Sequence, residues 1–101
     1  MTIARKGRLA IGLIGVGRLG RVYARDLAGR IAETRLVAVA DPVGTLAQEV
    51  AAEFDVPRHY TDPQALIDDA AVEAIVIVSP TDTHRQLVIA AAQRGKPTFC
   101  E

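Results

Sequence analysis

The chain has 101 residues, of which 50% are hydrophobic and only 4% are aromatic, and its 12 basic and 12 acidic residues cancel. The apolar content excludes a disordered chain, and the length allows one small domain with a single core. Zero net charge leaves no electrostatic footprint for nucleic acid or an anionic membrane surface, so we expect neither partner.

Five short segments have the composition of β-strands, and helical patterns separate them. Residues 9–14, 36–40 and 74–78 are continuous apolar runs, which is typical of strands covered on both faces of a parallel sheet. Residues 58–60 are a candidate edge strand, and residues 98–100 look like the beginning of another. Because the chain ends inside this last segment, we expect it to be a piece of a longer protein.

The segments between the strands carry apolar residues at the spacing of amphipathic helices. Asp62 and Pro63 indicate a helix start, since an acceptor caps the helix and proline fits its first turn, whereas Gly95 indicates a helix end. The residues expected on the inward helix faces are Leu19, Val22, Tyr23, Leu27 and Ile31, then Leu46, Ala47, Val50, Ala51 and Phe54, and finally Leu87, Val88, Ala91 and Ala92.

Strands and helices therefore alternate, which predicts an α/β fold with a parallel sheet and right-handed crossovers. We expect a Rossmann-like, doubly wound sheet, truncated after about five strands. Residues 1–101 would form one dinucleotide-binding domain, because no repeat, low-complexity tract or linker divides them.

A glycine-rich loop follows the first strand. The segment Gly15-Val16-Gly17-Arg18-Leu19-Gly20 matches the pattern G-x-G-x-x-G, and it has the strand before it and the helix after it that dinucleotide binding requires. The first glycine permits a tight turn, the second lets a diphosphate approach the backbone, and the third lets the helix pack on the strand. N–H groups at the helix start would then hold the anion.

Asp41 stands directly after the second strand, 21 residues beyond Gly20. The dinucleotide fingerprint places an acid at about this distance, where its carboxylate accepts hydrogen bonds from the adenosine ribose. Because a carboxylate would repel a 2′-phosphate, Asp41 favours NAD over NADP. The alternative interpretation is an ordinary glycine turn, with Asp41 as a turn residue before Pro42.

A second polar segment follows the fourth strand, at the edge of the sheet where the ligand of a doubly wound fold lies. The hydroxyls of Ser79 and Thr81 can reach a ribose or a diphosphate. A second interpretation is that Thr81, Asp82 or Thr83 caps the next helix. His84 is open between two roles: a core histidine bonded to a backbone carbonyl, or a side chain that points at the cofactor crevice.

The remaining polar residues predict structure rather than chemistry. His59 is interpreted as an edge-strand residue, Cys100 as a small apolar core residue, and Asp55, Asp68 and Asp69 as loop and helix-end acids. No spacing typical of a metal site or a nucleophile triad occurs, so we expect no metal ligand and no catalytic residue. The single cysteine excludes an internal disulfide framework and favours a cytoplasmic protein.

Several of these segments together resemble the N-terminal half of the glucose-fructose oxidoreductase/inositol dehydrogenase/rhizopine catabolism (Gfo/Idh/MocA) family, and within it the inositol 2-dehydrogenases. The resemblance spans essentially the whole chain. The matching segments are residues 11–20, Val-Ala-Asp at 39–41, Tyr-Thr-Asp at 60–62, Ser-Pro-Thr-Asp-Thr-His at 79–84 and Gly-Lys-Pro-Thr-Phe-Cys-Glu at 95–101. The resemblance implies an NAD-dependent oxidoreductase that acts on a sugar or polyol, with myo-inositol as one candidate.

The resemblance also implies a set of cofactor-binding residues. The loop would hold the diphosphate, Asp41 the adenosine ribose, and the second polar segment the path to the nicotinamide ribose. Glu101 matches the glutamate of the family's Glu-Lys-Pro motif, but the lysine and the second domain's aspartate and histidine are absent from this sequence. The implied set is Gly15, Gly17, Arg18, Leu19, Gly20, Asp41, Ser79, Pro80, Thr81, His84 and Glu101.

Three expectations follow for the behaviour of the chain. It should bind NAD in preference to NADP, and it should not oxidise a polyol by itself. It should associate into a homo-oligomer through the exposed last strand, the alternative being a monomer whose last strand frays. A stand-alone nucleotide-binding or sensing module and a methyltransferase-type fold are the competing functions, and the glycine spacing and the family-like ending speak against the second.

Overall fold

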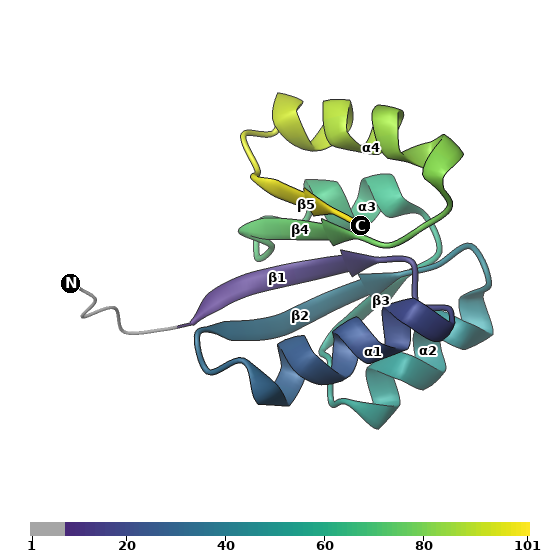
Figure 1. Cartoon of the computed structure of the whole chain (residues 1–101), viewed down its shortest axis with the longest axis vertical. Helices are drawn as coiled ribbons and strands as arrows, with labels where there is room; N and C mark the ends of the chain where they lie inside the picture. Colours follow the sequence, from purple (N-terminus) through teal and green to yellow (C-terminus); the bar gives the residue numbers. More distant parts are fainter. Residues whose placement is uncertain (1–7) are drawn as a thin grey trace.

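The computed structural model describes residues 8–101, and a five-stranded sheet lies at its centre (Figure 1). Every neighbouring pair of strands is parallel, in the order β3-β2-β1-β4-β5. This order confirms the predicted doubly wound α/β fold, since the chain builds outward from β1 in both directions. The strands are β1 (Leu9–Ile14), β2 (Thr34–Ala40), β3 (Arg58–Tyr60), β4 (Ala74–Ile77) and β5 (Thr98–Cys100).

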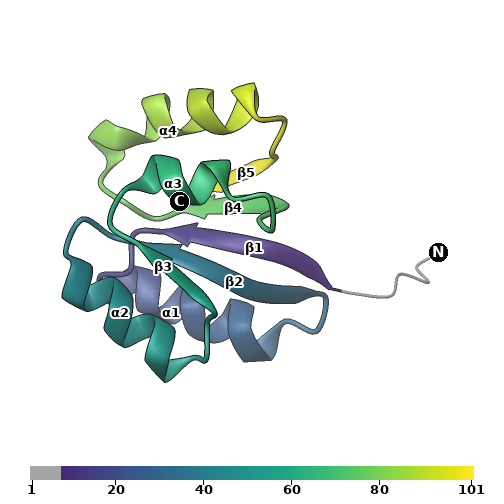
Figure 2. The same ribbon diagram turned by 180° about the vertical axis from the view of Figure 1, so that it is seen from behind.

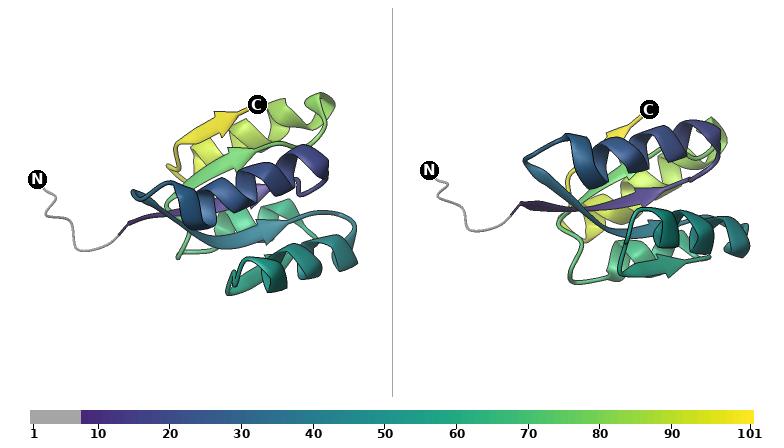
Figure 3. Two further views of the ribbon diagram at one scale, coloured as in Figure 1. Left: turned by 60° about the horizontal axis from the view of Figure 1, so that its bottom comes forward. Right: turned by 90° about the horizontal axis from the view of Figure 1, so that it is seen from below.

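Helices cover both faces of the sheet. On one side lie α1 and α2, and on the other lie α3 and α4, as the front and back views and the views toward the sheet edge show (Figures 1, 2 and 3). None of the helices within residues 8–101 is long and apolar enough to cross a membrane. The helices are α1 (Arg18–Arg25), which continues as the π-helical turn η1 (Asp26–Arg30), α2 (Gly44–Glu53), α3 (Pro63–Asp68) and α4 (Thr81–Gln93).

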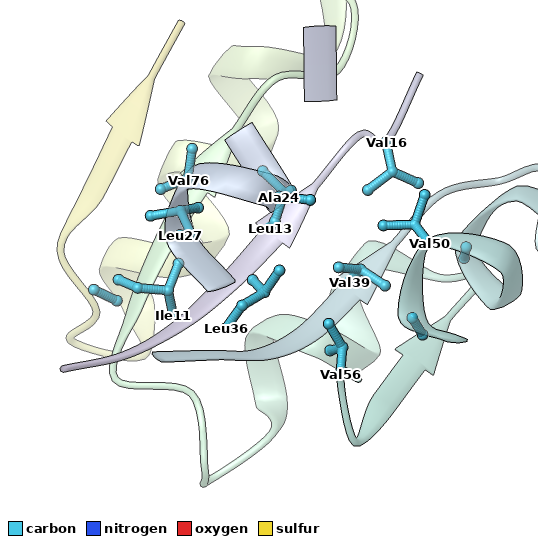
Figure 4. Packing of buried hydrophobic residues seen from close by; sticks show 13 residues of the cluster. Ile11, Leu13, Val16, Ala24, Leu27, Leu36, Val39, Val50, Val56 and Val76 are labelled. Atoms are coloured by element: carbon cyan, nitrogen blue, oxygen red, sulfur yellow. The ribbon is translucent and has the colours of Figure 1, made fainter. Parts of the chain in front are cut away.

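The apolar strands contribute side chains to two separate cores, because successive side chains of a strand point to opposite faces of the sheet. In β1, Ile11 and Leu13 join the core beneath α1 and α2, whereas Ala10 and Ile14 join the core beneath α3 and α4. Figure 4 shows the first of these cores, in which strand residues meet side chains from α1, η1 and α2. A continuous apolar run is therefore required of each central strand, as predicted.

The inward face predicted for α1 is wrong in part. Leu19, Val22 and Ile31 are 48%, 41% and 41% exposed, while Gly20 and Ala24 are buried. At Gly20 no side chain fits, because a Cβ there would collide with the carbonyl oxygen of Gly15 in the preceding loop. The π-helical turn then changes the helical period after Arg25, which removes Ile31 from the expected stripe. Of the five residues predicted to face inward, Leu27 is buried and Tyr23 packs against the core.

The helix boundaries follow the predicted signals. Asp62 caps α3, where its Oδ1 accepts a hydrogen bond from the Gln64 backbone N–H at 2.9 Å. At the other end of α3, the Lys96 ammonium donates to the carbonyl oxygens of Ile67 and Asp69 at 2.6 and 2.7 Å. Gly95 follows the end of α4, as expected.

The residues expected to have structural roles lie where the sequence predicts them, except Cys100. His59 is exposed on the edge strand β3, and Asp69 ends α3 with its side chain only 9% exposed. Cys100 is wrong as a core residue: it is exposed. It lies on β5, the edge strand beside β4, and no further strand within residues 8–101 pairs with β5.

Asp69 is held by several groups at once. It accepts hydrogen bonds from the Tyr60 hydroxyl at 2.7 Å and the Ala71 backbone N–H at 2.9 Å, and the Arg58 guanidinium lies 3.5 Å away. Desolvation pushes the pKa of the Asp69 carboxyl upward, but these hydrogen bonds and cations outweigh it, so the pKa lies below its usual value. The same hydrogen bond raises the pKa of Tyr60.

Candidate functional site

A pocket of about 500 Å³ lies at the carboxyl ends of the strands. It sits where β1 and β4 are neighbours and their following helices leave toward opposite faces of the sheet, which is the usual ligand position in a doubly wound fold. The lining residues are Ile14, Gly15, Gly17, Ala40, Asp41, Pro42, Leu46, Pro63, Val78, Ser79, Pro80, Thr83, Gln86 and Leu87.

The glycine loop forms one wall of the pocket, and its first and third glycines are sterically required. Gly15 has φ +95°, and a Cβ there would lie 2.6 Å from the backbone nitrogen of Ser79. A Cβ on Gly20 would lie 1.9 Å from the carbonyl oxygen of Gly15. The first glycine therefore permits both the turn and the contact with the end of β4, and the third permits the close approach of α1.

Gly17 differs from its two neighbours. A Cβ at this position would meet no atom within 4 Å, although the residue lines the pocket and caps α1. The space beside it is therefore open to a ligand, and the N–H groups of the first turn of α1 are not used by an intrahelical bond. This combination fits a diphosphate held against the backbone.

Asp41 closes the pocket beside the loop and is 9% exposed. Its Oδ2 accepts a hydrogen bond from the Val16 N–H at 3.0 Å, and its Oδ1 accepts one from the Val43 N–H at 2.9 Å. The carboxylate thus ties the glycine loop to the turn after β2. Because a carboxylate offers about four acceptor positions, each oxygen can still accept a hydrogen bond from a ribose hydroxyl.

The segment after β4 forms the opposite wall through side-chain hydrogen bonds. The hydroxyls of Ser79 and Thr83 lie 2.7 Å apart, and the Thr83 hydroxyl donates to the Pro80 carbonyl at 2.7 Å. His84 Nε2 donates to the Ser79 carbonyl at 2.7 Å, which is the first of its two expected roles. Asp82 makes no capping hydrogen bond at the start of α4.

Glu101 lies outside the pocket, beside α1. Its carboxylate accepts a hydrogen bond from the Tyr23 hydroxyl, and this hydrogen bond raises the pKa of Tyr23. The Tyr23 ring also packs against Phe99 at a tilt of 43°, with 6.3 Å between the ring centres. The end of β5 is thereby attached to α1.

The structure brings some of the predicted site residues together and leaves others apart. Gly15, Gly17, Asp41, Ser79 and Pro80 line one pocket. The other predicted residues do not line it; they are Arg18, Leu19, Gly20, Thr81, His84 and Glu101. Gly20 and His84 nonetheless support the two walls, through the close approach of α1 and the bond to Ser79.

Several lining residues were not predicted as site residues. Pro42, Leu46 and Pro63 form an apolar side of the pocket, and the exposed residue Gln86 lines it from α4. The sequence spacing could have identified the lining residues of α4. Positions 83, 86 and 87 are separated by three and four residues, which places them on one stripe of a helix that starts at the crevice.

The lining residues are suited to binding rather than proton transfer. Asp41 is the ionisable side chain among them, and its two oxygens already hold backbone N–H groups. The pocket joins apolar walls, a carboxylate and an open stretch of backbone at a helix start. This combination fits a nucleotide, which has a flat base, a diol and a phosphate in that order.

Comparison with known families agrees with this geometry. Residues 9–101 match the family model described as "Oxidoreductase family, NAD-binding Rossmann fold". The scyllo-inositol 2-dehydrogenase (NAD(+)) of Bacillus subtilis is 37% identical over 89 residues, which cover 88% of this chain and 26% of that protein. The myo-inositol 2-dehydrogenase of Thermotoga maritima is 39% identical over 93 residues, which cover 92% of this chain and 28% of that protein.

A solved structure has a similar fold. The scyllo-inositol dehydrogenase of Lactobacillus casei, crystallised with NAD(H) and scyllo-inositol, is similar with a TM-score of 0.88 and 30% identity. The likeness covers 92% of this chain and 27% of that one. The chain therefore spans about a quarter of the length of the relatives it matches.

Proposed function

This chain belongs to the Gfo/Idh/MocA oxidoreductase family as an NAD-binding Rossmann domain, and from that premise we propose that the whole protein transfers a hydride between NAD and a polyol or sugar. Inositol is the first substrate to test, because relatives that match most of this chain carry inositol dehydrogenase names. Bound NAD supplies the hydride acceptor. The residues of this chain bind and orient it.

The observation that carries the cofactor proposal is the meeting of Gly17 and Asp41 in one pocket. Open space beside Gly17 accepts the diphosphate, and the Asp41 carboxylate accepts hydrogen bonds from the adjoining ribose. A 2′-phosphate would bring a second negative charge against a nearly buried carboxylate, so NAD is preferred over NADP.

Titration calorimetry with NAD and NADP tests this proposal. The protein should bind NAD at least tenfold more tightly, because a hydrogen-bonded carboxylate discriminates by about 1.4 kcal/mol or more. Asp41→Ala should weaken NAD binding and reduce the difference in affinity between NAD and NADP. The control is Glu49→Ala, which removes the same charge from an exposed position on α2. Equal affinities of the unsubstituted protein for both cofactors would contradict the assignment.

The isolated chain should bind the cofactor without catalysis. Rate enhancement needs a positioned base and a bound substrate, and the lining residues supply neither. An assay for NADH formation with myo-inositol should therefore detect turnover with the full-length protein and none with residues 1–101. Absence of turnover by the full-length protein with any polyol or sugar would favour the alternative, a nucleotide-sensing module.

The exposed side of β5 supports self-association as a further part of the proposal. Phe99 is 54% exposed on an edge strand, and Ile89 is 47% exposed on the neighbouring helix α4. Exposed apolar edges of this kind pair with another chain. Light scattering across a concentration series should show a dimer or larger species, and a monomer mass that persists at high concentration would contradict self-association.

We also propose that the protein is cytoplasmic, which its single cysteine favours.

A further inference from the structure

The side of the pocket formed by α4 presents one polar side chain without an assigned role. Thr83, Gln86 and Leu87 all line the pocket, and their spacing puts them on one stripe of the helix. Within this stripe Leu87 is buried, whereas Gln86 is exposed at the rim of the pocket. The Gln86 amide is therefore accessible to a ligand in the pocket.

The other polar side chains of the pocket are already engaged. Both Asp41 oxygens accept backbone N–H groups, and the hydroxyls of Ser79 and Thr83 bond to each other, with Thr83 also donating to a carbonyl. The Gln86 amide makes no hydrogen bond within the described part of the chain. Its carbonyl and its two N–H groups can all serve a ligand.

The surroundings of Gln86 are suited to a flat base. Pro42, Leu46, Pro63 and Leu87 give the pocket an apolar lining on two sides. A base attached to a ribose at Asp41 would occupy this apolar part, because the base is the next group along the nucleotide from the ribose. One edge of the base then faces the rim, where the Gln86 amide can serve as its hydrogen-bonding partner.

We propose that Gln86 selects adenine, with its amide oxygen accepting a hydrogen bond from the 6-amino group and its amide N–H donating to an adjacent ring nitrogen. A primary amide and adenine are complementary in this way, since each offers one donor next to one acceptor. Gln86 is thus a specificity-determining residue for the base. This inference rests on the proposed binding of NAD in the pocket.

The test uses the full-length protein and two cofactors: NAD, and an analogue in which purine without the 6-amino group replaces adenine. Calorimetry should show that the unsubstituted protein binds NAD about five- to tenfold more tightly, the usual worth of one hydrogen bond. Gln86→Ala should weaken NAD binding by a similar factor and bind the two cofactors within about twofold of each other, since the remaining contacts are shared.

Two further variants separate this role from a general effect on α4. Gln86→Glu keeps the acceptor for the amino group, so it should still prefer NAD to the analogue even where its charge weakens both. Gln93→Ala removes an exposed glutamine of the same helix that does not line the pocket, and it should leave both affinities unchanged.

Each outcome bears on the inference. Equal affinities of the unsubstituted protein for the two cofactors would overturn it, as would a preference for NAD that survives in Gln86→Ala. Failure of the unsubstituted protein to bind NAD would instead remove the proposed function on which the inference depends. Loss of the preference in Gln86→Ala, with recovery in Gln86→Glu, would establish it.

Discussion

The two walls of the pocket are built in different ways. The loop between β1 and α1 takes its shape from missing side chains, because Cβ atoms at Gly15 and Gly20 would collide with backbone. The segment between β4 and α4 takes its shape from side chains that are present, through the Ser79–Thr83 pair and the bond from His84 to the Ser79 carbonyl. The walls meet where Gly15 approaches Ser79.

The difference predicts how each wall responds to mutation. A backbone collision cannot be relieved without moving the helix that follows, so changes in the loop are severe or nearly silent, depending on the space at each glycine. A hydrogen-bonded segment loses one bond at a time, and another donor can replace the one removed. Substitutions at Gly20, Gly17 and His84 test this contrast, and one at Asp69 tests a region outside both walls.

The largest effect is expected at the third glycine of the loop. Gly20→Ala puts a methyl group 1.9 Å from a carbonyl oxygen, so α1 must move away from β1. Alanine has the better helix propensity by about 1 kcal/mol, yet the collision should destabilise the protein by about 3 kcal/mol. Urea unfolding measures the change. A stability equal to that of the unsubstituted protein would show that the packing of α1 is not as tight as described.

The second glycine should separate binding from stability. Gly17→Ala meets no atom within 4 Å, so the free energy of unfolding should change by less than about 0.5 kcal/mol. The added methyl group occupies the space left for the diphosphate, and NAD affinity should fall about tenfold or more. Calorimetry and urea unfolding on the same sample check both parts. Unchanged NAD affinity would mean that the diphosphate lies elsewhere.

A smaller effect is expected at the side-chain wall. His84→Leu leaves the Ser79 carbonyl without its donor and should cost about 1 kcal/mol of stability. NAD affinity should fall less than in Gly17→Ala, because Ser79 and Pro80 line the pocket while His84 only supports them. His84→Gln, which can place an N–H near the same position, should recover most of both losses. If the two variants behave alike, the hydrogen bond is not what positions this wall.

The last prediction concerns a third region, at the end of α3, where the effect depends on pH. The pKa of Asp69 is lowered in the folded protein, so its contribution to stability is present above its usual pKa and is lost as the pH falls through the folded value. Asp69→Asn should therefore cost about 1 kcal/mol near pH 7, and the cost should shrink toward pH 3. Urea unfolding of both proteins at pH 7 and at pH 3 measures this cost. A cost that is independent of pH would mean that the charge of Asp69 is not involved.

Several features of the site were predictable from sequence because they depend on local constraints. Gly15 and Gly20 stand where a turn and a close helix approach exclude a side chain, and such positions leave a recognisable spacing. The helix start at Asp62 and Pro63 is equally local. The position of Asp41 in the pocket followed from the parallel sheet, since the carboxyl ends of β1 and β2 lie at one edge.

Other features depended on contacts between distant segments. The face of α1 was predicted from hydrophobicity, but Gly20 and Ala24 are the residues buried there, and the carbonyl of Gly15 leaves no space for a side chain at Gly20. Cys100 has a small apolar side chain of the kind found in cores, but it is exposed because it lies on the edge strand. The hydrogen bond that the Val16 N–H donates to the Asp41 carboxylate joins residues 25 positions apart, and no spacing rule reveals it.

The sequence by itself determined the order of strands and helices, the glycine loop and the acid after β2, because backbone sterics and side-chain alternation act over a few residues. Only the tertiary structure decided which residues share the pocket. Gln86 lines it from α4 while Pro63 lines it from α3, and the packing of both helices on the same face of the sheet brings them together. Such proximity is a property of packed layers rather than of any segment of the chain.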